Sequence, residues 1–117
     1  MLPRKNRLTG RYEYRKVYRD GKKVGNSFFN LFYLKLLDPE EATKVGIVVS
    51  KKLVKSSPKR NRLKRIFREI VRINFGKMGS GYWVVINPKL SALNGKYAEI
   101  NAEFVKTIQK IPFPRAV

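Results

Sequence analysis

The sequence predicts a single-domain α+β fold, a sandwich of one sheet with helices on a face, in the order α-β-β-β-α-β-α. The 117 residues suit one domain, and the 43% that are hydrophobic suffice for a core. Three segments space their apolar residues three and four apart, as helices do. Runs rich in β-branched or aromatic residues separate these segments, so we expect residues 1–117 to form one layered domain.

A basic arm and a short helix are predicted before the first strand. Residues 1–8 are expected to be extended and flexible. A helix over residues 10–20 is indicated because Tyr14, Val17 and Tyr18 share one face, and a glycine that can end the helix follows.

Four runs are predicted to be strands. The aromatic content of residues 27–37 favours a strand, with Phe29 and Leu31 facing the core and Phe32 on the opposite face. The four runs are residues 22–24 (a short edge strand), 27–37, 44–50 and 81–87. A last amphipathic helix follows them, with apolar residues at Ile100, Phe104, Ile108 and Ile111.

The helix predicted over residues 58–75 has an unusual distribution of charge. We expect Ser57 to cap it and Pro58 to take its first position. Its predicted core stripe consists of Leu63, Ile66, Phe67, Ile70 and Ile73. Its first two turns hold the cations Lys59, Arg60, Arg62, Lys64 and Arg65. Cations at this end add to the positive pole of the helix dipole, so the pattern favours a polyanion that docks there.

The charge of the whole chain also indicates a polyanionic partner. Lys and Arg number 27 against 8 acids, which gives a formal net charge of +19. Nineteen of these 27 cations lie in residues 4–23 and 51–72, so the charge belongs to two surfaces of a folded domain and not to a tail.

The composition excludes several kinds of site. The chain has no cysteine and no histidine, so disulfides, thiolate metal sites and the commonest general base are absent. We therefore predict no catalytic side chain and no metal bound by the protein. No signal peptide is visible and no apolar run is long enough for a membrane span, so no membrane partner and a cytoplasmic location are expected.

Aromatic residues adjoin the N-terminal basic segment, a combination that suits single-stranded RNA. Such RNA is held by bases stacked on aromatic rings and by cations along its backbone. From the residues alone, Tyr14 and Tyr18 fit a groove and the core equally well.

The motifs of residues 45–65 resemble the signature of the protein subunit of bacterial ribonuclease P. The resemblance rests on Lys51-Lys52 and on the run Lys59-Arg60-Asn61-Arg62-Leu63-Lys64-Arg65, preceded by a valine-rich strand. Asn6-Arg7-Leu8 and the tyrosines of the first helix also fit, so the resemblance covers about residues 5–110.

This resemblance implies a fold like the second domain of ribosomal protein S5, with a βαβ crossover of the rare left hand. It also implies a function, as the protein subunit of a ribonucleoprotein endoribonuclease that removes the 5′ leader of precursor tRNA. The partners would be the catalytic RNA and precursor tRNA. The cleavage would be Mg²⁺-dependent, with Mg²⁺ held mainly by the RNA, which fits a chain that lacks catalytic side chains.

The two lines of argument together assign two sets of residues. The predicted contacts with the catalytic RNA are Lys51, Lys52, Arg60, Asn61, Arg62, Lys64, Arg65 and Arg68. The predicted leader groove contains Tyr14, Tyr18 and Phe32, and Phe32 stands at the leader-contacting aromatic position of the family. The alternative function is a ribosome-associated or RNA-chaperone-type binding protein without a role in cleavage.

Overall fold

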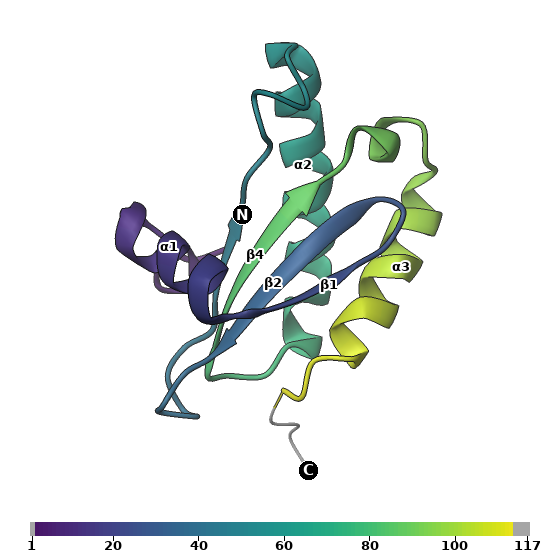
Figure 1. The fold of residues 1–117 in the computed structure, drawn as a ribbon. Coiled ribbons are helices and arrows are strands. Elements are labelled where there is room, and N and C mark those ends of the chain that lie inside the picture. The colour runs from purple at the N-terminus through teal and green to yellow at the C-terminus, as the bar shows by residue number, and fades with distance from the viewer. Residues whose placement is uncertain (1, 114–117) are drawn as a thin grey trace.

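A four-stranded sheet lies between one helix on one face and two helices on the other (Figure 1). The computed structural model describes residues 2–113, and the order of its elements is the predicted one. The helices are α1 (Gly10–Asp20), α2 (Ser57–Asn74) and α3 (Tyr97–Gln109), and the strands are β1 (Lys22–Gly25), β2 (Phe29–Lys35), β3 (Lys44–Ile47) and β4 (Tyr82–Pro88). Short 3-10 helices span Arg4–Asn6, Phe75–Lys77 and Leu90–Leu93.

The strands lie in the order β1-β2-β4-β3. β1 and β4 both run antiparallel to β2, whereas β3 runs parallel to β4 and is joined to it through α2. In Figure 1 these two strands point upwards, β4 lies to the right of β3, and α2 lies behind the sheet. This arrangement is the left-handed form of a βαβ unit, which about 2% of such connections adopt. The hand implied by the family resemblance is therefore confirmed.

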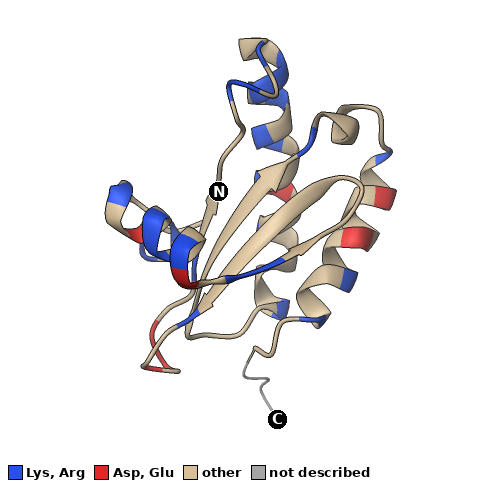
Figure 2. Cartoon of the chain, in the orientation of Figure 1, with Lys and Arg blue, Asp and Glu red and all other residues tan. Residues whose placement is uncertain are grey.

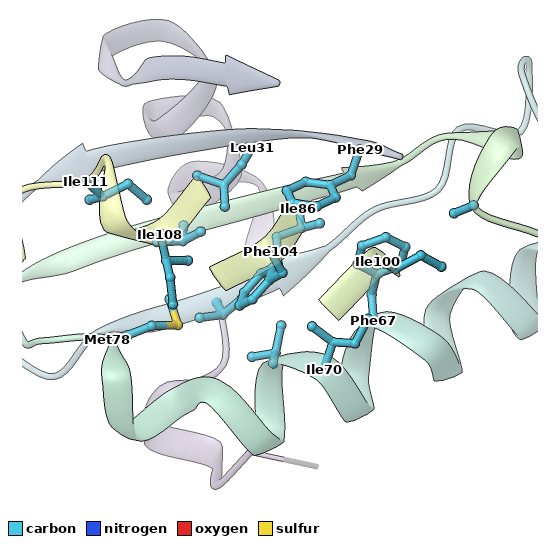
Figure 3. Packing of buried hydrophobic residues seen from close by; sticks show 14 of the residues in the cluster. Phe29, Leu31, Phe67, Ile70, Met78, Ile86, Ile100, Phe104, Ile108 and Ile111 are labelled. Carbon is cyan, nitrogen blue, oxygen red and sulfur yellow. The ribbon is translucent and has the colours of Figure 1, made fainter. Parts of the chain in front are cut away.

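The main core lies between the sheet and the helices α2 and α3 (Figure 3). Phe29 and Leu31 are both fully buried there, as predicted. The ring of Phe29 contacts Phe67 of α2 and Phe104 of α3, with centroids 5.4 and 5.8 Å apart. One strand thus packs against two helices, which fixes α2 relative to the sheet.

A second, smaller core lies between the sheet and α1. Val17 is fully buried against Trp83 and Val85 of β4, with Phe32 and Leu34 packed around them. The alternation predicted for residues 27–37 is confirmed, because even and odd positions of β2 reach different cores. The prediction that helices cover one face is wrong, since α1 covers the opposite face from α2 and α3.

Local structure corrects three further expectations. The arm is not extended, because Arg4–Asn6 forms a 3-10 turn, Leu8 is buried and its amide donates to the Val45 carbonyl at 3.2 Å; Met1 lies outside the described residues. α2 is capped one residue earlier than expected, at Ser56, whose Oγ accepts from the Lys59 amide. Ile73 is 52% exposed, and Val71 and Asn74 complete the buried stripe of α2 instead. Within residues 2–113, no helix combines the length and the apolar character that a membrane span requires.

Candidate RNA-binding surface

Cations gather on α1, on the loop that follows β3 and on α2, as Figure 2 shows. The acids lie mostly elsewhere, on α3 and on the turn after β2. α2 contains seven cations and one acid, Glu69, whose carboxylate pairs with Arg72. The described part of the chain therefore presents an uneven charge distribution, with positive potential concentrated around α2.

The loop between β3 and α2 is held in a defined turn. Ser50 Oγ accepts hydrogen bonds from the amides of Lys52 and Leu53, at 3.2 and 3.4 Å. The Val54 amide donates to the Ser50 carbonyl, and the Val54 side chain is buried in the core. Lys51 and Lys52 are exposed at the tip of this anchored turn, where they extend the charge of α2.

Arg60 braces the same loop against α2. Its Nη1 donates to the carbonyls of Val54 and Lys55 at 2.8 and 2.9 Å, and its Nη2 donates to Ser57 Oγ at 2.8 Å. Most of the guanidinium's hydrogen-bonding capacity is thereby used inside the protein. Arg60 thus positions the loop, a role that the sequence pattern does not reveal.

The remaining predicted residues of α2 are arranged around its outer side. Asn61, Arg65 and Arg68 are spaced four and three residues apart, so they lie on one face, opposite the buried stripe, and all three are exposed. Lys64 is partly buried beside them. Arg62 lies on another side, where it lines a hollow of about 410 Å³ with Lys59, Leu90 and other residues.

The exposed and partly exposed polar residues of the loop and of α2 form one surface, which we call the basic surface. It comprises Lys51, Lys52, Lys59, Asn61, Arg62, Lys64, Arg65 and Arg68. None of its seven cations takes part in an ion pair among the described residues. Unpaired guanidinium and ammonium groups at this density are suited to binding phosphates.

The structure brings Tyr18 and Phe32 together. Their rings meet edge to face with centroids 4.9 Å apart, and the Tyr18 hydroxyl accepts from Asn87 Nδ2 at 3.0 Å. The ammonium of Lys23 lies 5.9 Å from the centre of the Phe32 ring. Tyr18 remains 40% exposed, so this pair presents aromatic surface beside a cation.

Tyr14 is partly buried at the other end of the α1–sheet contact. Its ring lies so close to Gly46 that a side chain there would meet the Tyr14 hydroxyl. Burial, followed by the neighbours Tyr18 and Glu13, raises the pKa of Tyr14. Tyr14 and Tyr18 therefore lie at the rim of the second core, neither fully buried nor free of it.

Two arginines of α1 were missed by the sequence reasoning. Arg11 and Arg15 line an open hollow of about 610 Å³ together with Tyr14 and Tyr18. Arg11 and Arg15 are four residues apart, as are Tyr14 and Tyr18. The helical spacing that predicted the two tyrosines on one face therefore also predicts the two arginines beside them.

A partly buried ion pair joins α1 to β3. Lys44 Nζ lies 2.8 Å from Glu13 Oε2, and the Thr9 amide donates to the same carboxylate at 2.8 Å. Burial alone would raise the pKa of Glu13, but the hydrogen bond from Lys44, the Thr9 amide and the Lys44 charge outweigh it and lower the pKa. The carboxylate is therefore held ionised and fixes α1 on the sheet.

Within residues 2–113, no three His, Cys, Asp or Glu side chains gather in a group that could hold a metal ion. What these residues can do is bind and position a polyanion. A profile of the family described as Ribonuclease P matches residues 2–112. The chain belongs to the ribonuclease P protein family.

Relatives in this family span most of the chain. The ribonuclease P protein component of Carboxydothermus hydrogenoformans is 33% identical over 102 residues, which are 87% of each chain. That of Clostridium acetobutylicum is 37% identical over 98 residues, 83% of this chain and 81% of the relative. The RNase P protein from Thermotoga maritima has the same fold, with a TM-score of 0.77 and 26% identity over 90% of this chain and 96% of that one. Membership in the ribonuclease P protein family does not favour the ribosome-associated or RNA-chaperone alternative.

Proposed function

We propose that this chain binds the RNA subunit of ribonuclease P through the basic surface and binds the precursor tRNA leader through Tyr18, Phe32 and the flanking cations of α1. The observation that supports this proposal is the basic surface itself, in which seven cations stand on one anchored loop and one helix and form no ion pair within residues 2–113. Cations in the first turns of a helix add to the positive end of its dipole, so the placement of Lys59, Arg62 and Arg65 near the start of α2 is explained best by phosphates that neutralise them.

The leader would be held differently from the RNA subunit. A single strand has exposed bases, and bases stack on aromatic rings whatever their sequence. The Tyr18–Phe32 pair offers such a ring surface, while Arg11, Arg15 and Lys23 can follow the phosphates. Tyr14 would border this path at the N-terminal end of α1.

The chemical step is assigned to the RNA. The carboxylates of the described residues form no cluster that fits Mg²⁺, so we infer that the RNA holds the Mg²⁺ that activates water for hydrolysis. The protein's residues then contribute by bringing the leader and the RNA subunit into one arrangement and by lowering the repulsion between their phosphates.

Reconstitution tests this function directly. The chain is mixed with a bacterial ribonuclease P RNA and a 5′-labelled precursor tRNA at low Mg²⁺, and release of the leader is followed in time. The expected result is that the chain accelerates cleavage and that the RNA without protein is slow under the same conditions. A chain that binds the RNA yet leaves the rate unchanged would contradict the proposal.

A further inference from the structure

A hollow of about 570 Å³ lies between the N-terminal segment, β3 and α2. Its lining residues come from four parts of the chain, namely residues 2–9, Tyr14 of α1, residues 44–47 and the second half of α2. It shares Tyr14 with the border of the proposed leader path and Arg68 with the basic surface, and its other lining residues belong to neither. Its volume is in the range of about 300–1,000 Å³ that is usual for sites that bind small organic molecules.

The hollow has an apolar floor and a cationic rim. Leu8, Val45 and Val71 are almost completely buried and form the floor. Arg4, Lys5 and Arg68 stand at the rim with exposed side chains. Such a division suits a ligand with one flat apolar part and one anionic part.

The charges at the rim are available to a ligand. Lys44 also lines the hollow, but its ammonium group forms an ion pair with the carboxylate of Glu13. Among the described residues, Arg4, Lys5 and Arg68 take part in no ion pair. These three residues give the rim three cations from two chain segments, and Arg7 adds a further positive charge to the lining.

We propose that this hollow binds a single unpaired nucleotide of the RNA partner. Its base would lie on the apolar floor beside the Tyr14 ring, and its phosphate would be bound by Arg4, Lys5 and Arg68. Arg68 belongs to both sites, so an RNA strand that leaves the outer face of α2 can reach the hollow without a break in cationic contacts. The inference rests on the proposed function only in taking the nucleotide from RNA.

A free nucleotide can test the hollow on the full chain without any RNA. Uridine 5′-monophosphate is titrated against the protein, and backbone amide shifts are recorded by NMR. We expect saturable shifts confined to Val45, Gly46, Val71 and the N-terminal segment, and weaker binding of inorganic phosphate. Shifts spread over α1 and the whole of α2, no saturation, or phosphate binding as tight as that of the nucleotide would each overturn the proposal.

A matched pair of charge reversals separates the hollow from general attraction. Lys5→Glu and Lys96→Glu change the net charge equally, but Lys96 is exposed at the start of α3, near the opposite edge of the sheet. Lys5→Glu should weaken nucleotide binding about tenfold, the effect of losing roughly one charge-assisted contact, and Lys96→Glu less than about twofold. Equal losses in the two variants would overturn the proposal. Melting curves of both variants are recorded as the control for folding.

Cross-linking tests whether the RNA lies at the hollow in the assembled complex. Because the chain has no cysteine, Lys5→Cys and Lys110→Cys can each be labelled with a thiol-reactive photo-cross-linker, and position 110 is exposed at the C-terminal end of α3. Position 5 should cross-link to one unpaired segment of the RNA and position 110 to none. Absence of a cross-link from position 5 in a complex that still cleaves precursor tRNA would overturn the hollow while leaving the proposed function intact.

Discussion

Arg60 and Arg65 belong to one basic run of α2, yet their guanidinium groups have different surroundings. Arg60 donates three hydrogen bonds to the loop before the helix and to Ser57. Arg65 is exposed and has no ion pair among the described residues. The same residue type therefore serves the fold at one position and is free for a ligand at the other.

Substitution by lysine should distinguish these two arginines. Arg65→Lys keeps a point charge and should reduce affinity for the RNA subunit only slightly, whereas Arg65→Ala should reduce it about tenfold. Arg60→Lys should resemble Arg60→Ala, because an ammonium cannot reproduce the fork that joins Val54, Lys55 and Ser57. Dissociation constants and melting temperatures check this. Full rescue of Arg60→Ala by lysine would show that only its charge matters.

Substitution of Phe32 should weaken the binding of precursor tRNA, which carries the leader, and leave the binding of mature tRNA unchanged. Removing the ring in Phe32→Ala removes a stacking surface, so affinity for precursor tRNA should fall by about 1–3 kcal/mol. Mature tRNA lacks a leader and should bind the holoenzyme almost unchanged. The measurement is the ratio of the two affinities, accompanied by a melting curve, because Phe32 also packs in the second core.

Tyr18→Phe is the matched control for that experiment. It removes the hydrogen bond with Asn87 but keeps the ring that meets Phe32. A leader bound by stacking should tolerate this change, with a loss of less than about 0.5 kcal/mol. If Phe32→Ala weakens both tRNAs equally at an unchanged melting temperature, leader recognition lies elsewhere.

At the scale of elements, α2 packs against the core on one side and presents the exposed cations of the basic surface on the other. The buried stripe ends at Asn74, whose Nδ2 donates to the Ile70 carbonyl and to Asn101 Oδ1 of α3, both at 2.8 Å. This polar link to α3 takes the place that an apolar residue would be expected to hold. Ile73 lies on the flank as a result, so the predicted stripe was wrong at its last residue only.

Two isoleucines of α2 provide a stability test with identical chemistry. Ile70 is fully buried and Ile73 is 52% exposed. Ile70→Ala should reduce the free energy of unfolding by about 2–5 kcal/mol, because it leaves a cavity in the main core. Ile73→Ala should change it by less than about 0.5 kcal/mol. Denaturant unfolding of both variants checks the difference, and similar losses would mean that the flank of α2 is packed as tightly as its core.

The ion pair between α1 and β3 should make stability depend on pH. The folded pKa of Glu13 is lowered from 4.5, so its stabilisation is present above pH 4.5 and is lost as the pH falls through the folded pKa. Glu13→Gln should therefore melt at a lower temperature than the natural sequence at pH 7, and the difference should shrink towards acid pH. A difference that stayed constant down to pH 3 would assign the effect to packing and not to charge.

At the scale of the whole molecule, local patterns predicted the elements and distant packing decided their arrangement. Helical and strand periodicity are properties of short segments, so the seven elements and the alternation along β2 could be predicted. The position of α1 on the opposite face depends on Val17 meeting Trp83 and Val85, which lie 66 and more residues away in sequence. The left-handed crossover likewise follows no local signal, and only the resemblance implied it.

The site was predictable to a similar extent. Residue types and helical spacing identified most of the basic surface, because cations in the first turns of a helix are unfavourable unless an anion binds there, and so indicate an anionic ligand. The brace made by Arg60 depends on how the loop folds back onto α2, and the hollow beside β3 depends on where residues 2–9 dock. Both arise from contacts between segments, so the sequence contained no pattern for them.

Salt should reveal how much of the +19 charge takes part in binding. If the seven cations of the basic surface each meet a phosphate, counterion release predicts that log K for the RNA subunit falls with log salt at a slope of about −5 to −6. Binding is measured at fixed Mg²⁺ over a range of monovalent salt. Arg65→Ala should make the slope shallower by about one, since it removes one phosphate contact, while Lys110→Ala, at the C-terminal end of α3, should leave it unchanged. A slope shallower than about −2 would mean that most cations of the basic surface are bystanders and that shape, not charge, holds the RNA.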